Sequence, residues 1–297
     1  MRLYIIGNGF DLHHGLRTSY NYYRDFLLEK SSGVVRDFES FGYFLNEYDE
    51  NEKLWSNLEK SLHFDYSEFA YHLVQDFYPD MNDESDSRWD NIYVESDVET
   101  EFAYKFVGEY FYEWIEGESQ RDTCADLELD KDGIYLSFNY TDTLTRIYEI
   151  KPENILHIHG SIGERENGLE FGSIENVYQQ CEDDLVKEYE NDDFYGASIE
   201  SAVKKLVEVT KITSKNIKQN YDRLSEFLHG HNINEIIIMG HSISDSEYDN
   251  GYYEDVIIPF VASDTSWKIY WYDEENKDKI LSFVNMYGIE EYELIKW

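Results

Sequence analysis

The chain has 297 residues, of which 41% are hydrophobic and 17% aromatic, and this apolar content excludes a mainly disordered or collagen-like protein. Its 63 acidic residues against 25 basic ones give a net charge of −38. Direct nucleic-acid binding and membrane association are therefore not expected, because both depend on clustered Lys and Arg. The sequence shows no long apolar run and no secretory signal, so we expect a cytoplasmic protein.

The first predicted element is a strand at residues 2–6, an apolar, β-branched run that stops at Gly7. From Asp25 to Glu118, aromatic residues recur at three- and four-residue spacing, which predicts helices broken near Pro79. Strands are then expected at 133–140 and 154–159, with a short one at 169–171.

Residues 178–229 return to a helical pattern, and Gly230 is suited to end that helix. The last predicted elements are strands at 233–240 and 267–272, a helix at 274–287 and a strand near Glu291. Apolar strands separated by helices are typical of a parallel sheet covered on both faces.

We therefore expect a single elaborated α/β domain, residues 1–297, with a Rossmann-like parallel sheet. Its core would comprise residues 1–30 and 131–297, and a large acidic helical insertion would occupy 31–130. Acidic runs at 80–101 and 182–193 are interpreted as solvated surface, and a surface that docks a basic partner is the alternative.

Polar sequence follows four of the predicted strands, beginning at Gly7, Asn139, His157 and Gly240. Ligands of open parallel sheets bind outside the carboxyl ends of the strands, so these four segments are expected to line one crevice.

The glycine-rich segment GNGFD contains Gly7 and Gly9, which allow a ligand to approach the backbone closely, but position 12 is Leu and the next glycine is Gly15. The dinucleotide-binding fingerprint is thus incomplete, and a tight turn is the alternative interpretation. Arg17 is the nearest cation to this segment. His13 and His14 match no zinc-binding spacing, so we expect no metal site.

In the segment HIHGS, we expect His157 and His159 to point to opposite faces, with only one histidine in the crevice. His157 is interpreted as a buried, hydrogen-bonded histidine and His159 as a general base. Asn139 would orient a ribose or a water, or would form a turn. For Ser242 and Asp245, a helix N-cap and a first-turn acid are the alternative roles.

Four blocks of the sequence resemble the bacteriophage abortive-infection family AbiH. They are IIGNGFDLHHGLRTSY at 5–20, FNYTDTL at 138–144, LHIHGSI with Phe171-Gly172 at 156–172, and IIIMGHSISDSEYD at 236–249. More distantly, the same blocks resemble the sirtuin-like NAD-binding superfamily.

The resemblance implies a nucleotide pocket with Asn139 and His159 as catalytic residues and NAD as substrate or ligand. The residues that it implies for nucleotide binding are Gly7, Asn8, Gly9, Phe10, Asp11, Gly15, Arg17, Thr18, Tyr140, Asp142, Gly240, His241, Ser242 and Asp245. The four-cysteine zinc module of deacylase sirtuins is missing, because the chain has only two cysteines, and position 141 is Thr.

The leading hypothesis is an antiviral NAD glycohydrolase that depletes host NAD. One alternative is a non-catalytic nucleotide-binding sensor, and another is an acidic interaction protein that occupies a basic, DNA-binding partner. A second copy of the chain and a phage or host trigger protein are the other partners considered.

Overall fold

The computed structural model describes residues 1–33, 35–36, 38–39, 51–56, 58–62, 105–163, 168–172, 214–243 and 247–297. The chain forms two compact units. The first comprises Met1–Ser19, Trp114–Leu169 and Asn216–Trp297, and the second comprises Tyr20–Glu113 and Glu170–Lys215.

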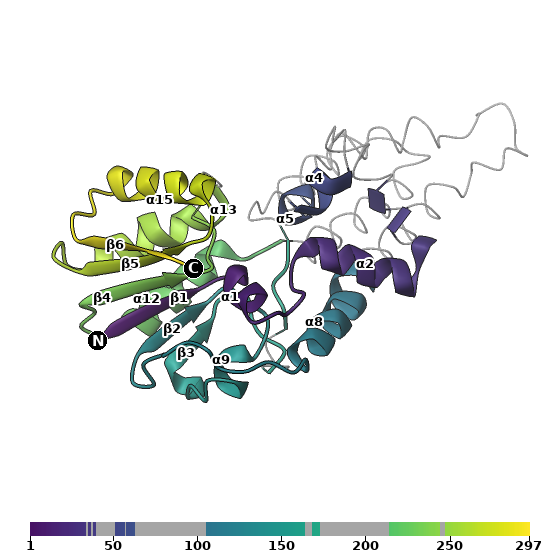
Figure 1. The fold of residues 1–297 in the computed structure, drawn as a ribbon, viewed down its shortest axis with the longest axis horizontal. Helices are drawn as coiled ribbons and strands as arrows, with labels where there is room; N and C mark the ends of the chain where they lie inside the picture. Colours follow the sequence, from purple (N-terminus) through teal and green to yellow (C-terminus); the bar gives the residue numbers. More distant parts are fainter. Residues whose placement is uncertain are drawn as a thin grey trace, which may run out of the picture. The chain divides into compact units, whose positions relative to one another are not determined.

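The first unit is built on a six-stranded sheet in which every pair of neighbours is parallel (Figure 1). The strand order is β3-β2-β1-β4-β5-β6, so the first strand lies near the centre. The strands are β1 Arg2–Ile6, β2 Ile134–Ser137, β3 Ile155–His157, β4 Glu235–Met239, β5 Ser266–Trp271 and β6 Tyr292–Lys296.

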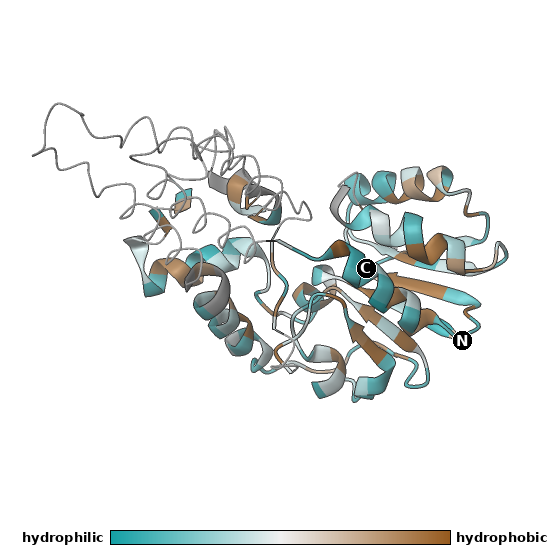
Figure 2. Cartoon of the chain, turned by 180° about the vertical axis from the view of Figure 1, so that it is seen from behind, coloured by the Kyte–Doolittle hydropathy of each residue, from teal (hydrophilic) through white to brown (hydrophobic). Residues whose placement is uncertain are grey.

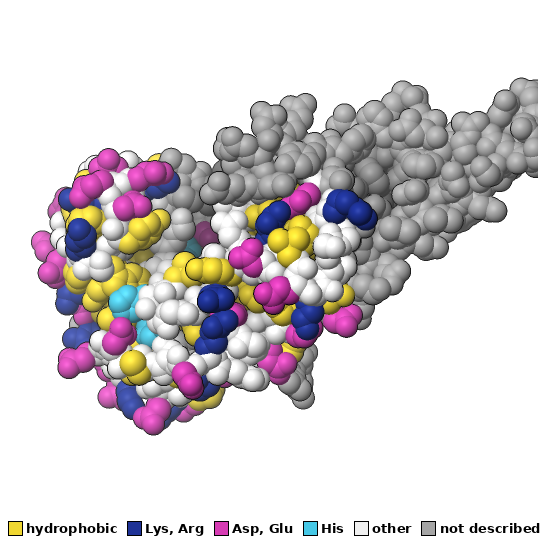
Figure 3. All heavy atoms as spheres, turned by 45° about the vertical axis from the view of Figure 1, so that its right-hand side comes forward, with side chains coloured by type: hydrophobic (Ala, Val, Ile, Leu, Met, Phe, Trp, Pro, Cys, Tyr) yellow, Lys and Arg dark blue, Asp and Glu magenta, His cyan; other side chains and the backbone are white. Residues whose placement is uncertain are grey.

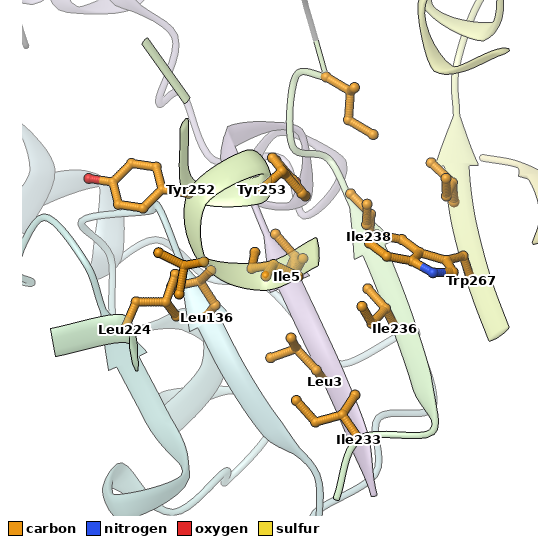
Figure 4. Close-up of a cluster of buried hydrophobic side chains, with 14 of the residues drawn as sticks. Leu3, Ile5, Leu136, Leu224, Ile233, Ile236, Ile238, Tyr252, Tyr253 and Trp267 are labelled. Atoms are coloured by element: carbon orange, nitrogen blue, oxygen red, sulfur yellow. The ribbon is translucent and has the colours of Figure 1, made fainter. Parts of the chain in front are cut away.

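Both faces of the sheet are covered, because the strands carry apolar side chains in both directions. Leu3 and Ile5 are fully buried in one cluster, which includes residues of the helices at 217–228 and 274–286 (Figure 4). Tyr4 and Ile6 belong to a separate cluster. Burying one such aliphatic side chain contributes about 1.5–3 kcal/mol. The strands appear as brown, hydrophobic ribbons between more polar helices in Figure 2.

The helical segments of the first unit connect successive strands. They are α1 Asn8–His13, α9 Thr143–Arg146, the 3-10 helix η3 Pro152–Asn154, α12 Ile217–Leu228, α13 Glu247–Gly251, the π-helix η4 Tyr252–Ile257, α14 Ile258–Phe260 and α15 Glu274–Met286. α8 Phe111–Ser119 begins in the second unit and ends in the first.

Side-chain caps fix where the two long helices start. The Asn216 carboxamide accepts a hydrogen bond from the Gln219 amide before α12, and the Asp273 carboxylate accepts one from the Asn276 amide before α15. A cap of this kind stabilises a helix by about 1 kcal/mol. After α12, Gly230 takes a left-handed φ of 86°, as the sequence predicts.

Helices make up the described part of the second unit. They are α2 Tyr20–Lys30, α4 Asn51–Ser56, α5 Leu58–Ser61 and the π-helix η2 Lys105–Tyr110. Tyr23, Trp55 and Phe106 are buried here and pack ring against ring. Lys215 is also buried, with its ammonium 2.7 Å from the Glu59 carboxylate.

The prediction of an α/β fold with a parallel sheet is confirmed. One predicted strand is wrong, because residues 169–171 form no strand. The helical break near Pro79, the pattern at 178–213 and most of the predicted acidic insertion lie outside the described residues, so that domain division stays a prediction. In the part of the chain that the structure describes, no helix is long and apolar enough to cross a membrane.

Candidate functional site

The four polar segments leave the sheet at the same level. Ile6, the last residue of β1, is in register with Ser137 of β2 and with Met239 of β4, and Ser137 is in register with His157 of β3. All of these strands are parallel, so the segments that follow them emerge from one edge of the sheet. The four segments therefore start from the same edge of the sheet, whereas their lining of one ligand crevice stays a prediction.

Three glycines allow the backbone that follows β1 to pack directly against the backbone that follows β4. A Cβ on Gly7 would stand 2.4 Å from the His241 Cα, and one on Gly9 would stand 2.7 Å from the Gly240 Cα. Gly240 has a left-handed φ of 67°, and a Cβ there would stand 2.1 Å from the Phe10 amide nitrogen. These positions need glycine for packing, independently of any ligand.

Two backbone amides of this loop donate hydrogen bonds to other backbone groups of the protein. The Gly7 amide donates to the Met239 carbonyl at 3.0 Å, and the Gly9 amide donates to the Gly240 carbonyl at 2.8 Å. Asn8, between them, is exposed. Gly15 lies past the end of α1 with a φ of 76° and open space around its Cβ position. The loop therefore offers a ligand fewer amide donors, since the Gly7 and Gly9 amides already have acceptors within the protein.

Asp11 is the most buried acidic group of the site, with 1% of its surface exposed. The Thr141 hydroxyl donates to one carboxylate oxygen at 2.7 Å, and the Thr143 hydroxyl donates to the other at 3.0 Å. Burial raises the pKa of Asp11 to about 6, against the hydrogen bonds from these hydroxyls and from Asn139, which lower it. Asp11 and its neighbour Phe10 are both inside the protein, not on a ligand-facing surface.

Asn139 connects the ends of three strands and is 6% exposed. Its side-chain nitrogen donates to the Gly7 carbonyl at 3.0 Å, its backbone amide donates to the Ser137 hydroxyl at 3.2 Å, and its carbonyl lies 3.1 Å from Nδ1 of His157. Among the described residues, no donor reaches its buried side-chain oxygen.

Tyr140 and Asp142 flank Thr141 in the same segment. Tyr140 is buried, and its carbonyl accepts the Ile162 amide at 2.9 Å. Asp142 lies at the start of α9, with a carboxylate oxygen 3.5 Å from Nε of Arg146. Both residues thus contact other parts of the protein, and these contacts help to hold the segment that carries Asn139 in place.

The two histidines of HIHGS have different surroundings, but the expectation that strand geometry separates them was wrong. β3 ends at His157 and the next two residues form a turn. Moreover, residues two apart in a regular strand share a face. His157 bonds the Asn139 carbonyl, which agrees with a structural role. His159 is 3% exposed and lies among aromatic rings, with Phe138 at 5.7 Å and Tyr252 at 6.1 Å.

The HIHGS turn closes on a second pair of glycines. Gly160 has a φ of 78°, and a Cβ there would stand 2.2 Å from the Gly168 carbonyl oxygen. The residue after His159 therefore has to be glycine for the turn to pack as it does.

His241, at the end of β4, has its Nδ1 3.0 Å from the Tyr253 hydroxyl and its ring centroid 4.1 Å from that of Phe138. Its Nε2 lies 3.5 Å from the Asp249 carboxylate. Ser242 is exposed, whereas Asp245 lies outside the described residues. Phe138 thus packs against both His159 and His241, and the sequence interpretation did not name it as a site residue.

Arg17 and Thr18 follow the glycine-rich segment. Arg17 is exposed, and its backbone amide donates to the buried Glu118 carboxylate at 2.8 Å. Thr18 is buried, and its hydroxyl meets no hydrogen-bond partner within the described residues.

On the face drawn in Figure 3, basic side chains lie scattered among acidic and polar ones.

His13 and His14 both contact the Asp126 carboxylate. His14 is buried, with Nδ1 2.6 Å from the Phe10 carbonyl and Nε2 2.5 Å from the Tyr148 hydroxyl, and burial lowers its pKa. Nε2 of His13 lies 3.0 Å from the Asp126 carboxylate. Across the described ranges, no group of three or more potential ligands could hold a metal ion.

Two further contributors were missed from sequence. Arg223 of α12 donates to the carbonyls of His157 and Ile158, both at 3.1 Å, and so ties α12 to the end of β3. Tyr252 packs against both Phe138 and His159. The apolar periodicity of α12 does not predict that Arg223 contacts the end of β3. The Tyr252-Tyr253 pair lies in an acidic stretch whose composition is typical of an exposed surface.

Comparison with protein families matches residues 3–271 of the chain to a family described as bacteriophage abortive infection AbiH. The chain belongs to the AbiH family. The match includes all of β1 except Arg2, continues through β5 and therefore contains all four segments of the candidate site. Comparison with curated proteins and with solved structures gave no match. AbiH membership associates this protein with abortive infection, by the family's description.

Proposed function

We propose that this AbiH protein acts in anti-phage abortive infection as a cytoplasmic NAD glycohydrolase. The observation that carries the proposal is Asn139: a buried carboxamide at the carboxyl edge of a parallel sheet, with an acceptor oxygen that no described residue engages. A ligand hydroxyl or a water would supply the missing donor.

The strand order supports a nucleotide as the ligand. The order β3-β2-β1-β4-β5-β6 is that of doubly wound dinucleotide-binding folds, whose ligands lie where the order reverses, between β1 and β4. The glycine-rich segment follows β1 at this point, and Asn139, which follows the neighbouring β2, donates to its Gly7 carbonyl at 3.0 Å. The more distant resemblance to the sirtuin-like superfamily supports the same ligand class.

In the proposed reaction, the bond between the ribose C1′ and nicotinamide breaks, and nicotinamide leaves with the bonding electrons. Water adds to C1′ of the oxocarbenium-like sugar, and its proton passes to His159, acting as the base. Asn139 orients the ribose hydroxyl or the water. His159 suits this role because a neutral imidazole can accept a proton near pH 7.

Phosphate binding has to overcome the charge of the protein. The net charge of −38 repels an incoming nucleotide at long range, and the Gly7 and Gly9 amides already have acceptors. We assign the Arg17 side chain and the Asn8 amide to the pyrophosphate. The same repulsion predicts that NAD binding tightens when salt screens the surface charge.

The test is to incubate the purified protein with NAD and to measure nicotinamide by chromatography. The expected result is that Asn139→Ala loses nicotinamide release while the protein stays folded. NAD binding by calorimetry without nicotinamide release would instead identify a nucleotide sensor. Neither binding nor release would exclude both functions and leave the acidic interaction protein as the candidate.

A further inference from the structure

His241 lies where the segments that follow β1, β2 and β4 meet. Its Cα is so close to Gly7 that a Cβ on that glycine would stand 2.4 Å away. Its ring centroid is 4.1 Å from that of Phe138, the residue that follows β2. The side chain of His241 is 3% exposed, so each of its ring nitrogens needs a hydrogen-bond partner other than bulk water.

The Tyr253 hydroxyl fixes which ring nitrogen of His241 carries the proton. It lies 3.0 Å from Nδ1, is fully buried, and meets no other hydrogen-bond partner within the described residues. Burial raises the pKa of Tyr253, so the hydroxyl keeps its proton. If Nδ1 donated to this oxygen, the O–H group would be buried without an acceptor. Tyr253 therefore donates, and Nδ1 is the unprotonated nitrogen that accepts.

The proton of the neutral His241 ring is then on Nε2. This nitrogen is buried, and no described residue hydrogen bonds to it. A carboxylate oxygen of Asp249 lies 3.5 Å away, beyond the roughly 2.7–3.2 Å that is typical of an N–H···O hydrogen bond. The structure thus presents a buried donor of fixed identity beside a carboxylate, and a ligand atom would supply the missing acceptor.

The Asp249 carboxylate limits which ligand atom can accept from Nε2. A phosphate oxygen there would be repelled by the negative charge, because the carboxylate lies 3.5 Å from the same nitrogen. A hydroxyl is compatible with both groups, since its oxygen accepts from an N–H and its proton can be donated to a carboxylate. A fixed donor beside an anion therefore favours a hydroxyl over a phosphate.

We propose that Nε2–H of His241 donates to a sugar hydroxyl of the ligand, and that Tyr253 is a positioning residue, which holds the imidazole in the tautomer that this contact requires. Asp249 accepts the proton of the same hydroxyl. That the hydroxyl belongs to a ribose rests on the proposed function, whereas the tautomer of His241 does not. His241 then contacts the sugar of the nucleotide and not its pyrophosphate.

The first arm of the test needs no ligand and determines the tautomer by NMR at neutral pH. In protein with 15N-labelled histidine, the His241 signals are identified by their loss in His241→Gln. We expect Nδ1 to resonate as an unprotonated nitrogen and Nε2 as a protonated one, and the Nδ1 signal to shift in Tyr253→Phe. Tyr135→Phe is the matched control, because it removes another buried hydroxyl, which donates to the Asp130 carbonyl at 2.8 Å.

Three results of this arm would overturn the proposal. The first is a proton on both nitrogens of His241, which would make the ring a cation paired with Asp249. The second is a proton on Nδ1 alone. The third is an Nδ1 signal that stays unchanged in a folded Tyr253→Phe, which would show that Tyr253 does not set the state of the ring.

The second arm measures the affinity of ADP-ribose, ADP and inorganic pyrophosphate by calorimetry, on variants whose melting temperatures show that they are folded. We expect His241→Ala to weaken ADP-ribose binding by roughly three- to tenfold, the loss of one hydrogen bond between neutral groups. His241→Gln, which keeps an N–H donor, should lose less. Tyr253→Phe should weaken ADP-ribose binding as well, whereas Tyr135→Phe and pyrophosphate binding by all of these variants should match the wild type.

Asp249→Ala tests the second contact of the hydroxyl. Removing the carboxylate lowers the repulsion of every anionic probe, and pyrophosphate measures that effect alone. We expect ADP-ribose to weaken relative to pyrophosphate in this variant, because only ADP-ribose loses the acceptor for its hydroxyl. An equal change for both probes would remove Asp249 from the proposed contact.

The three probes also decide which ribose carries the hydroxyl. ADP contains only the adenosine ribose, so a loss for both ADP and ADP-ribose in His241→Ala assigns the hydroxyl to that sugar. A loss for ADP-ribose alone assigns it to the second ribose. An equal loss for pyrophosphate would identify a phosphate contact, and it would refute the hydroxyl assignment. So would unchanged affinities, or a wild type that binds none of the probes.

Nicotinamide release separates this inference from the proposed function. A wild type that binds ADP-ribose but releases no nicotinamide from NAD disproves the hydrolase, and the affinities of the His241 variants still decide the hydroxyl contact. Release by the wild type, together with unchanged affinities in His241→Ala, refutes the contact and leaves the hydrolase in place.

Discussion

Gly9 and Gly240 are packed backbone against backbone, with the Gly9 amide donating to the Gly240 carbonyl at 2.8 Å. A Cβ on either glycine would stand 2.7 Å or less from atoms of the other. From sequence, these glycines suggest room for a pyrophosphate, whereas the structure fills that room with protein. A bulky substitution at Gly9 would therefore destabilise the fold, and any loss of ligand binding that followed would not show that Gly9 contacts the ligand.

Gly240→Ala should be much more destabilising than Gly15→Ala, although both glycines have left-handed φ angles, 67° and 76°. Each substitution incurs the strain of that backbone conformation, about 1–2 kcal/mol. Only at Gly240 does the added carbon also meet backbone, whereas nothing lies within 4 Å at Gly15. Urea unfolding of both variants measures the difference, and equal stabilities would contradict the packing argument.

Asn139→Ala should lower turnover far more than NAD affinity if Asn139 orients water in the transition state. A loss of two decades or more is expected, and each decade corresponds to about 1.4 kcal/mol. Calorimetry, nicotinamide release and the melting temperature are measured on one preparation. If turnover and affinity both stay near wild type while the melting temperature drops, Asn139 only shapes the turn.

His159→Ala should abolish turnover with little loss of stability, whereas His157→Ala should mainly lower the melting temperature. His157 hydrogen bonds the Asn139 carbonyl, and the loss of such a buried contact costs about 1–3 kcal/mol. His159 instead lies among aromatic rings at the proposed site. An unfolded His159→Ala beside a stable but inactive His157→Ala would reverse the assignment.

Asp11→Asn should gain stability relative to wild type as the pH rises. The pKa of Asp11 is raised from 3.8 to about 6 in the fold, so between these values the native state holds a proton that the unfolded chain has released. The free energy of unfolding of the wild type therefore falls with rising pH, by roughly 3 kcal/mol in all and about 1.5 kcal/mol from pH 5 to pH 7.5, whereas Asp11→Asn lacks this titration. Urea unfolding at both pH values checks this, and a constant difference would show that Asp11 is not buried as described.

Nicotinamide release should be unaffected by EDTA, because the proposed mechanism uses a histidine base and a carboxamide and assigns no step to a metal ion. The measurement is release before and after dialysis against the chelator. Activity that disappears on dialysis and returns with a divalent ion would contradict a metal-free mechanism.

Much of the fold follows from short-range patterns that the sequence displays openly. The apolar runs at 2–6 and 235–239 are buried strands because both faces of the sheet are covered, and Asp273 and Gly230 mark helix boundaries by their side-chain chemistry and backbone freedom. The run at 169–171 has similar composition but forms no strand. Three residues carry too little pattern to separate a strand from a loop.

The site was harder to predict, because its decisive contacts join residues 65 or more positions apart in the sequence. The sequence shows that Asp11, Asn139 and Gly240 follow strands, but not that Asp11 faces Thr141 and Thr143 in the interior. Nor does it show that Arg223 caps the carbonyls at the end of β3. Such contacts depend on strand order and register, which local spacing does not encode.

The glycine contacts have a consequence for mutational scanning of this protein. A side chain would press against backbone at four glycines and reduce the amount of folded protein: Gly7, Gly9, Gly160 and Gly240. Substitutions there would therefore lower the survival of cells challenged with phage as strongly as substitutions of Asn139 or His159. A scan that reads only protection would thus combine two kinds of position. Measuring protein abundance for each variant alongside protection would separate them, and positions that lose protection at full abundance would outline the chemical site.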